Sequence, residues 1–212
     1  MPNNHLPSDD EEELLAAQGY QLVAGIDEVG RGALVGPVVA AAVILPRGIK
    51  ARWWGQVRDS KQLTPAAREL LFDFICDNAI AVGVGRADHE AIDTQGIVRA
   101  TRLAMKSAIE CLTPLPQYLI IDYLSLPEVK LPQKAIVHGD GLCLSIACAS
   151  IVAKVARDRL MAELDGVYPG YNFARHKGYG TPEHLDCLYR LGPCLIHRRS
   201  FRPVKEMGRR GK

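Results

Sequence analysis

Two adjacent carboxylates follow a short apolar segment near the start of the chain, and this pattern constrains the fold and the chemistry most. The segment 22–26 has the composition of a buried strand, and Asp27 and Glu28 come directly after it. Residues 30–32, Gly-Arg-Gly, come next. Carboxylate oxygens suit hard cations such as Mg²⁺, and glycines beside an arginine let the backbone approach a ligand. The pattern favours phosphoryl-transfer chemistry on a nucleic acid.

Apolar runs and helical periodicities alternate along the chain, which indicates the α/β class with a mixed sheet. The runs at 21–26 and 38–45 lie close together, so we expect an antiparallel hairpin connected by residues 30–36. Thr64 and Pro65 are typical of an N-cap followed by proline in the first turn. The other predicted strands are 79–84, 118–121 and 134–137, and the predicted helices are 65–78, 97–112, 142–164 and 181–191.

Charge is distributed unevenly along the 212 residues. The formal net charge is +2, but residues 9–13 form a run of five acids, and outside that run 26 basic residues oppose 19 acidic ones. We expect residues 1–18 to form a tail that frays or makes a loose acidic turn. The C-terminal end is basic, which favours a polyanionic partner or only improves solubility. Its basic residues are Arg198, Arg199, Arg202, Lys205, Arg209, Arg210 and Lys212.

Cysteine usage and apolar run lengths predict a cytoplasmic protein without membrane association. None of the six cysteines forms a Cys-x-x-Cys pair, and no histidine spacing completes a zinc site. We therefore expect free thiols in a reducing compartment. The N-terminus lacks the apolar core of a signal peptide, and the longest apolar run, 37–46, is too short to cross a bilayer. The length is that of one domain.

Four carboxylates are candidates for a shared metal site. Asp27 and Glu28 end one predicted strand, Asp122 ends another, and Asp158 continues the apolar stripe of the predicted helix 142–164. A carboxylate on a buried face needs a cation or a basic partner. Simpler roles remain open, because strand-end aspartates often cap a following turn and Asp158 has basic neighbours. Asp27 and Glu28 can reach one site only if the strand ends there, since side chains alternate along a strand.

A nucleotide-binding P-loop is the rival interpretation of the same glycines. Gly25 and Gly30 have the spacing of that motif's first half, but Arg31 stands in place of its lysine and Gly32 in place of its hydroxyl residue. Acids inside such a loop would repel phosphates, so we reject this interpretation. A second glycine pair at 83–86 is more typical of a strand end.

A glycine- and tyrosine-rich region at 168–181 is a candidate nucleic-acid contact. Tyrosine offers a flat face for stacking and a hydroxyl for hydrogen bonding, and Arg175 and Lys177 lie within the region. The alternative is an ordinary surface loop. His176 and His197 are possible bases, although a lone loop histidine is more often structural.

The chain resembles type 2 ribonuclease H (ribonuclease HII) in several separate motifs that occur in the right order. The resemblance implies a ribonuclease H-like fold, with a mixed five-stranded sheet flanked by helices and additional C-terminal helices. It implies one catalytic domain over 19–204, between an acidic flexible tail at 1–18 and a basic tail at 205–212. The motifs are 25–32 with 36–39, 59–63, 118–122, 149–161, 168–184 and 197–204.

The resemblance also implies an activity. Members of this family hydrolyse the RNA strand of RNA–DNA hybrids and incise on the 5′ side of ribonucleotides embedded in duplex DNA, leaving 5′-phosphate and 3′-hydroxyl ends. Two Mg²⁺ or Mn²⁺ ions take part. The family's metal-binding, catalytic acids correspond to Asp27, Glu28, Asp122 and Asp158 in this chain.

The same resemblance implies residues that read the substrate. The family's Gly-Arg-Gly, which binds the ribose 2′-hydroxyl, corresponds to Gly30, Arg31 and Gly32, and its junction-reading tyrosine corresponds to Tyr179. The chain departs from the family at Tyr123, where a small residue is common. Weaker candidates for phosphate contact are Lys61, Lys154, Arg175 and Lys177, with an ion pair to Asp158 as the alternative role of Lys154.

Two other functions remain possible from the residues alone. One is a protein that binds hybrids without a working metal site, and the other is a small-molecule phosphotransferase. The expected partners are RNA–DNA hybrids and ribonucleotide-containing DNA duplexes, and we expect a monomer. Metal-dependent cleavage of a polynucleotide separates the nuclease from both alternatives.

Overall fold

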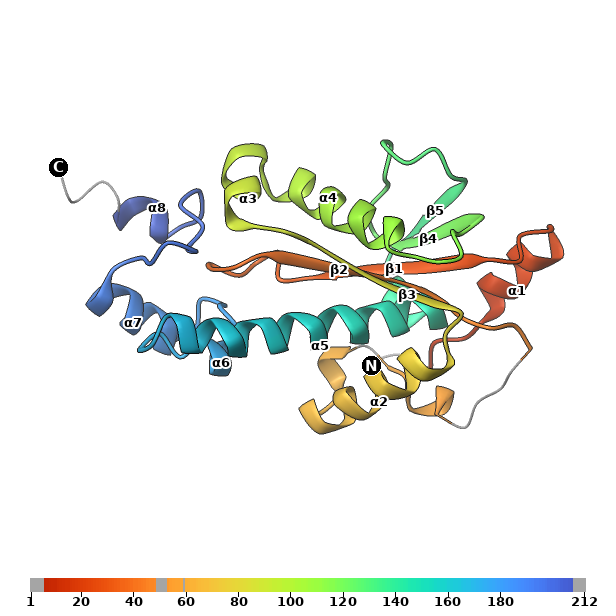
Figure 1. Cartoon of the computed structure of the whole chain (residues 1–212), viewed down its shortest axis with the longest axis horizontal. Coiled ribbons are helices and arrows are strands. Elements are labelled where there is room, and N and C mark those ends of the chain that lie inside the picture. Colours follow the sequence, from red (N-terminus) through yellow and green to blue (C-terminus); the bar gives the residue numbers. More distant parts are fainter. Residues whose placement is uncertain (1–5, 49–52, 59, 208–212) are drawn as a thin grey trace.

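A single five-stranded sheet with helices on both faces forms the centre of the computed structural model, which describes residues 6–48, 53–58 and 60–207. The strand order is β3-β2-β1-β4-β5 (Figure 1). The strands are β1 (Val23–Val29), β2 (Val38–Ile44), β3 (Ala81–Ala87), β4 (Tyr118–Asp122) and β5 (Gln133–Ile136). The helices are α1 (Asp10–Ala17), α2 (Pro65–Asn78), α3 (His89–Gln95), α4 (Ile97–Glu110), α5 (Leu144–Val167), α6 (Phe173–His176), α7 (Pro182–Leu191) and α8 (Val204–Met207), with short 3₁₀ turns η1 (Trp54–Gln56), η2 (Ser60–Gln62) and η3 (Gly139–Gly141).

The sheet is mixed, as predicted. β1 and β2 form the expected antiparallel hairpin, β2 pairs antiparallel with β3, and β1, β4 and β5 run parallel to one another. Parallel neighbours end at the same edge of a sheet, so β1, β4 and β5 direct their following residues toward one region. Asp59, part of a motif noted above, lies outside the described residues.

Two layers of helices cover the sheet. Helix α4 packs on one face, whereas α5 and α2 pack on the other (Figure 1). Helix α4 approaches β3 so closely that a Cβ atom at Gly83 would lie 2.1 Å from the Ala108 carbonyl oxygen, and one at Gly85 would lie 2.2 Å from that of Ala104. The prediction that this glycine pair marks a strand end is therefore wrong. Both glycines lie inside β3, where they make room for the helix.

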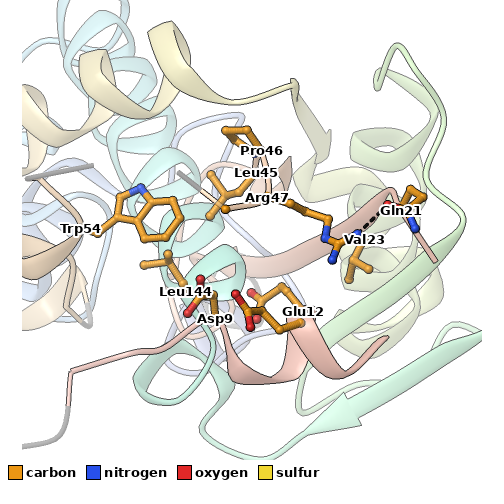
Figure 2. Close-up of a pocket in the computed structure, with 11 residues that line it drawn as sticks. Asp9, Glu12, Gln21, Val23, Leu45, Pro46, Arg47, Trp54 and Leu144 are labelled. Atoms are coloured by element: carbon orange, nitrogen blue, oxygen red, sulfur yellow. Dashed lines mark hydrogen bonds between the residues drawn. The ribbon is translucent and has the colours of Figure 1, made fainter. Parts of the chain in front are cut away.

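The acidic run forms a helix, which corrects the prediction of a fraying tail or loose turn. Leu15 of α1 is buried. The Glu12 carboxylate accepts hydrogen bonds from the Ser145 backbone nitrogen (2.9 Å) and hydroxyl (2.6 Å). Acidic residues in a first turn also interact favourably with the helix dipole. Helix α1 therefore docks on the start of α5. Figure 2 shows a pocket beside it, in which Arg47 donates to the Gln21 side chain.

The C-terminal segments gather at the opposite end of the sheet (Figure 1). Arg198, expected in a basic surface region, is fully buried and donates hydrogen bonds to backbone carbonyls. That expectation is wrong for Arg198, because its guanidinium binds carbonyls in the protein interior. Arg209, Arg210 and Lys212 lie outside the described residues. Within the described ranges, no helix has both the length and the apolar character that crossing a bilayer requires.

Gly85 offers a test of the close packing between α4 and β3. We expect Gly85→Ala to lower the free energy of unfolding by about 1–3 kcal/mol, because the added methyl group has no room. Gly166→Ala is the matched control: this exposed glycine of α5 has no neighbouring atom within 4 Å of an added Cβ. Alanine there should stabilise the helix by up to about 1 kcal/mol. Urea unfolding measures both changes, and equal effects would contradict the packing argument.

Candidate active site

Asp27 and Asp122 meet where β4 ends beside β1. The last parallel pair of these strands is Ile26 with Ile121, so the two aspartates are the next residues along the same edge. Asp27 is 5% exposed. Asp122 accepts a hydrogen bond from the backbone nitrogen of Gly139 at 2.7 Å. The two aspartates therefore lie at one edge as predicted, although only Asp122 is the last residue of its strand.

Strand β1 continues past its two acids, so the expectation that it ends at them is wrong. The requirement drawn from it is wrong as well, because the charges of Asp122 and Lys61 act on Glu28 within the continued strand. Asp27 pairs with Ala41 and Glu28 with Ala40 in the ladder to β2, which holds both residues in the strand. Glu28 accepts a hydrogen bond from the Arg31 guanidinium at 3.1 Å. Its other oxygen, Oε2, is buried without a hydrogen-bond partner.

Burial and mutual repulsion disfavour the charged forms of these acids. Burial raises the pKa of Asp27 well above its usual value, and the charges of Glu28 and Asp122 raise it further, against a hydrogen bond from Ser150. Burial also raises the pKa of Glu28, whereas the charge of Arg31 and its hydrogen bond lower it. The same effect raises the pKa of Asp122, against the hydrogen bond from Gly139. A bound cation would offset this repulsion.

Asp140 is a further acid at this site that the sequence analysis missed. It lies in η3, directly after β5, and its negative charge contributes to the raised pKa of Asp122. The Lys61 ammonium lies 3.8 Å from the Asp140 carboxylate. The signal was available, because the loop holding Asp140 follows a predicted strand just as Asp122 ends one. We call Asp27, Glu28, Asp122 and Asp140 the acid cluster.

Asp158 has different partners. Its carboxylate lies 2.5 Å from the Lys154 ammonium and 3.8 Å from the Arg68 guanidinium. Ser150, which contacts Asp27, is eight residues earlier in α5, and at about 1.5 Å per residue the two positions are roughly 12 Å apart. The ion pair with Lys154, noted as the simpler alternative, is what forms.

The acid cluster suits a divalent cation in its chemistry. All its donors are carboxylate oxygens, the Glu28 Oε2 atom is buried and unpartnered, and the acids raise one another's pKa. As the side chains stand, the described residues include no group of three or more His, Cys, Asp or Glu with the geometry to hold a metal ion. The argument that a divalent cation fits the acid cluster therefore rests on the type of donor atom and on the electrostatics.

Residues 30–37, which we call the recognition loop, join β1 to β2 and depend on Arg157. Gly30 has a φ of +90°, and a Cβ atom there would lie 2.2 Å from Arg157 Nε, so only glycine fits. Gly32 is exposed, and nothing lies within 4 Å of an added Cβ. The fully buried Arg157 donates to the carbonyls of Pro37 (3.1 Å), Lys177 (2.8 Å) and Val35 (3.3 Å).

A second buried arginine completes the support of the recognition loop. Arg198 donates to the carbonyls of Gly36 (3.0 Å) and Arg31 (2.8 Å). Burial, with the charge of Arg157 adding to it, lowers the pKa of Arg198 to about 9, so the group stays charged at neutral pH. The two guanidiniums leave the loop little freedom, since each binds several fixed carbonyls.

Tyr179 lies next to the recognition loop. Leu34 donates from its backbone nitrogen to the Gly178 carbonyl at 2.8 Å, and the Arg157 guanidinium carbon lies 5.5 Å from the Tyr179 ring centroid. The fold therefore brings together the predicted Gly-Arg-Gly segment and the predicted tyrosine from distant parts of the sequence.

The four lysine and arginine candidates have different surroundings. Lys61 lies beside Asp140 in the acid cluster. Lys154 pairs with Asp158, and Lys177 donates to the Asp158 carbonyl at 3.4 Å. Arg175 pairs with Glu183 at the surface. Of these four, Lys61 alone is placed by the described contacts next to the acids.

Comparison with known proteins identifies the family. The family model described as Ribonuclease HII matches residues 24–204. The chain is 59% identical to a ribonuclease HII of Dehalococcoides mccartyi, covering 95% of each protein, and 54% identical to that of Geobacter sulfurreducens, covering 93% of this chain and 89% of the relative. This chain belongs to the ribonuclease HII family. It is a metal-dependent endonuclease with ribonuclease H activity on RNA–DNA hybrids.

Solved structures agree with this assignment. The ribonuclease H2 of Pyrococcus horikoshii superposes with a TM-score of 0.75 at 26% identity, covering 89% of this chain and 98% of that one. Ribonuclease HII from a complex with PCNA of Archaeoglobus fulgidus superposes with a TM-score of 0.72 at 25% identity, covering 85% and 95%. The predicted ribonuclease H-like fold is confirmed.

Asp27 offers a test of the buried repulsion. Because folding raises its pKa, wild-type protein should lose stability as pH rises through that pKa, and Asp27→Asn should not. In EDTA at pH 8 we expect the variant to be more stable by roughly 0.5–2 kcal/mol, typical of relieving active-site strain. The difference in stability between the variant and the wild type should shrink near pH 4. Adding Mg²⁺ should raise the melting temperature of wild type only. A wild type as stable as the variant at pH 8 would refute the repulsion.

Proposed function

We propose that the enzyme hydrolyses phosphodiesters with two divalent cations held by Asp27, Glu28, Asp122 and Asp158. The observation that carries this proposal is that the buried Asp27 and the half-buried Glu28 and Asp122 repel one another at the shared edge of β1 and β4. When bound, two Mg²⁺ or Mn²⁺ ions supply an activated water and stabilise the leaving 3′-oxygen. A ribonuclease HIII that shares the fold, with a TM-score of 0.66 at 19% identity, is described in complex with Mn²⁺.

Asp158 is the proposed fourth acid. Lys154 and Arg68 pair with its carboxylate, and these ion pairs would give way to a bound cation or lie beside it. Asp140 is a second candidate, because its charge acts on Asp122, although the Lys61 ammonium lies 3.8 Å from its carboxylate.

The proposed substrate is duplex DNA with embedded ribonucleotides as well as longer hybrids. Incision on the 5′ side of a ribonucleotide would leave 5′-phosphate and 3′-hydroxyl ends. The backbone of Gly30 to Gly32 and the Tyr179 hydroxyl would bind the 2′-hydroxyl, the group that distinguishes RNA from DNA. Supporting this, Gly32 is open to solvent and the Arg31 carbonyl is fixed by Arg198. Lys61, Lys154, Arg175 and Lys177 would contact phosphates.

We propose that residues 19–204 act as one catalytic domain of a cytoplasmic monomer. The six cysteines are all free thiols, which suits a reducing compartment. Residues 1–18 and 205–212 would contribute no catalytic residue.

Incision of a DNA duplex carrying one ribonucleotide tests this function. We expect a cut just 5′ of the ribonucleotide with Mg²⁺ or Mn²⁺, none with EDTA, and none in an all-DNA duplex. Asp27→Asn should abolish the cut while duplex binding survives. Cleavage by that variant at the wild-type rate would remove Asp27 from the metal site, and cleavage of the all-DNA duplex would remove the 2′-hydroxyl reading.

Paired variants identify the fourth acid. Asp158→Asn should lower the rate constant of cleavage by roughly 100-fold or more, because it removes a metal ligand, whereas Asp140→Asn should keep it within about 10-fold. Single-turnover cleavage at saturating enzyme gives both values. The reverse ranking would make Asp140 the ligand in place of Asp158.

Tyr179→Ala tests the tyrosine. We expect it to reduce incision at a single ribonucleotide by roughly 10-fold or more relative to cleavage of a long RNA tract, because only the single site depends on one junction contact. The ratio of kcat/KM on the two substrates is the measurement. Equal loss on both would exclude the junction role.

A further inference from the structure

A buried group of three histidines lies behind Tyr179, and the proposed chemistry uses none of them. His176 is 7% exposed, and His184 and His197 are fully buried. Their rings pack around Phe173, with centroid distances of 5.9, 5.7 and 5.9 Å. Three buried titratable side chains in one place need a reason, because each must satisfy two ring nitrogens.

The hydrogen bonds of this group fix one arrangement of protons. Burial lowers the pKa of His184 and of His197 to about 4, so both rings are neutral at pH 7. The Tyr179 carbonyl lies 2.9 Å from His184 Nδ1 and only accepts, so that nitrogen carries the proton. His184 Nε2 is then an acceptor, and His197 Nε2, 3.2 Å away, must donate to it. His197 Nδ1 in turn accepts from the Cys194 backbone nitrogen at 3.0 Å.

His176 holds the residue before Tyr179 in the same way. Its Nδ1 accepts from the Gly178 backbone nitrogen at 3.2 Å, so its Nε2 donates to the Tyr171 carbonyl at 2.7 Å. Its ring stacks on that of His184, with centroids 4.3 Å apart. Gly178 also accepts from the backbone of Leu34 in the recognition loop. The histidines therefore fix the backbone of 178–179 from the side opposite to the loop.

We propose that His184 is a positioning residue for ribonucleotide recognition, whose Nδ1–H holds the Tyr179 carbonyl and so sets the tyrosine against the recognition loop. His197 and Cys194 fix the tautomer of His184 that makes this donor available. The inference rests on the proposed role of Tyr179. The acid cluster belongs to β1, β4 and η3, so loss of the His184 contact should change substrate discrimination and leave the metal chemistry intact.

Two substitutions at His184 separate its two nitrogens. His184→Asn keeps an N–H donor near the Nδ1 position for the Tyr179 carbonyl and loses the contact with His197. His184→Gln reaches the Nε2 position and loses the donor to Tyr179. We expect Gln to lower the ratio of kcat/KM for a single ribonucleotide over that for a long hybrid by roughly 3- to 10-fold, the effect of one hydrogen bond. Asn should keep the ratio within about 2-fold of wild type.

Tyr179→Ala, assayed in parallel, distinguishes the possible failures. If Tyr179→Ala leaves the ratio unchanged, the proposed role of the tyrosine fails. If Tyr179→Ala lowers it but His184→Gln does not, the positioning inference alone is overturned. An equal fall of the ratio in the Asn and Gln variants, together with equal falls in melting temperature, would also overturn it, because His184 would then be only structural.

The tautomers provide a measurement that needs no variant. Long-range ¹H–¹⁵N spectra of the wild-type imidazoles at pH 7 should show a proton on Nδ1 of His184 and on Nε2 of His197. A His184 ring with no proton on Nδ1 would overturn the inference.

Discussion

The close contact between helix α5 and strand β1 is the constraint on which the rest of the site depends. A Cβ atom at Gly25 would lie 2.3 Å from atoms of Ser145, so the helix can approach only because that residue is glycine. Farther along the same contact, Ser150 hydrogen bonds to Asp27 and Arg157 lies against Gly30. One helix therefore positions both the acids and the recognition loop, which keeps the groups proposed to cleave and to read the substrate in a fixed relation.

Buried charge is treated differently in the two parts of the site. Arg157 and Arg198 are buried, and between them they bind five backbone carbonyls, so their charge stabilises a loop. The acids have few such partners, and Glu28 Oε2 has none. A folded chain tolerates that cost where a cation is to be bound, because the cation offsets the repulsion between the acids.

Sequence patterns predicted most of the fold because its strands and long helices are strongly periodic. That periodicity was enough to predict the hairpin, the strand ending at Asp122 and helix α5. Helix α1 was not, since its stability comes from docking on Ser145, a contact between residues far apart in sequence. The partners of Asp158 were also out of reach: an apolar stripe shows that Asp158 is on a half-buried face but not that Lys154 and Arg68 both pair with it there.

Discrimination at one ribonucleotide demands more precision than hydrolysis does. A long hybrid offers many 2′-hydroxyls, so an imprecise contact with any one of them costs little, whereas a single embedded ribonucleotide must be read in one register. The two buried arginines, Arg157 and Arg198, fix the recognition loop from one side. Tyr179 comes from the other end of the chain, and its backbone is held by a histidine network that shares no residue with the acid cluster. The histidine support of Tyr179 is therefore separate from the residues that position the acids, so we expect that discrimination can change without loss of hydrolysis.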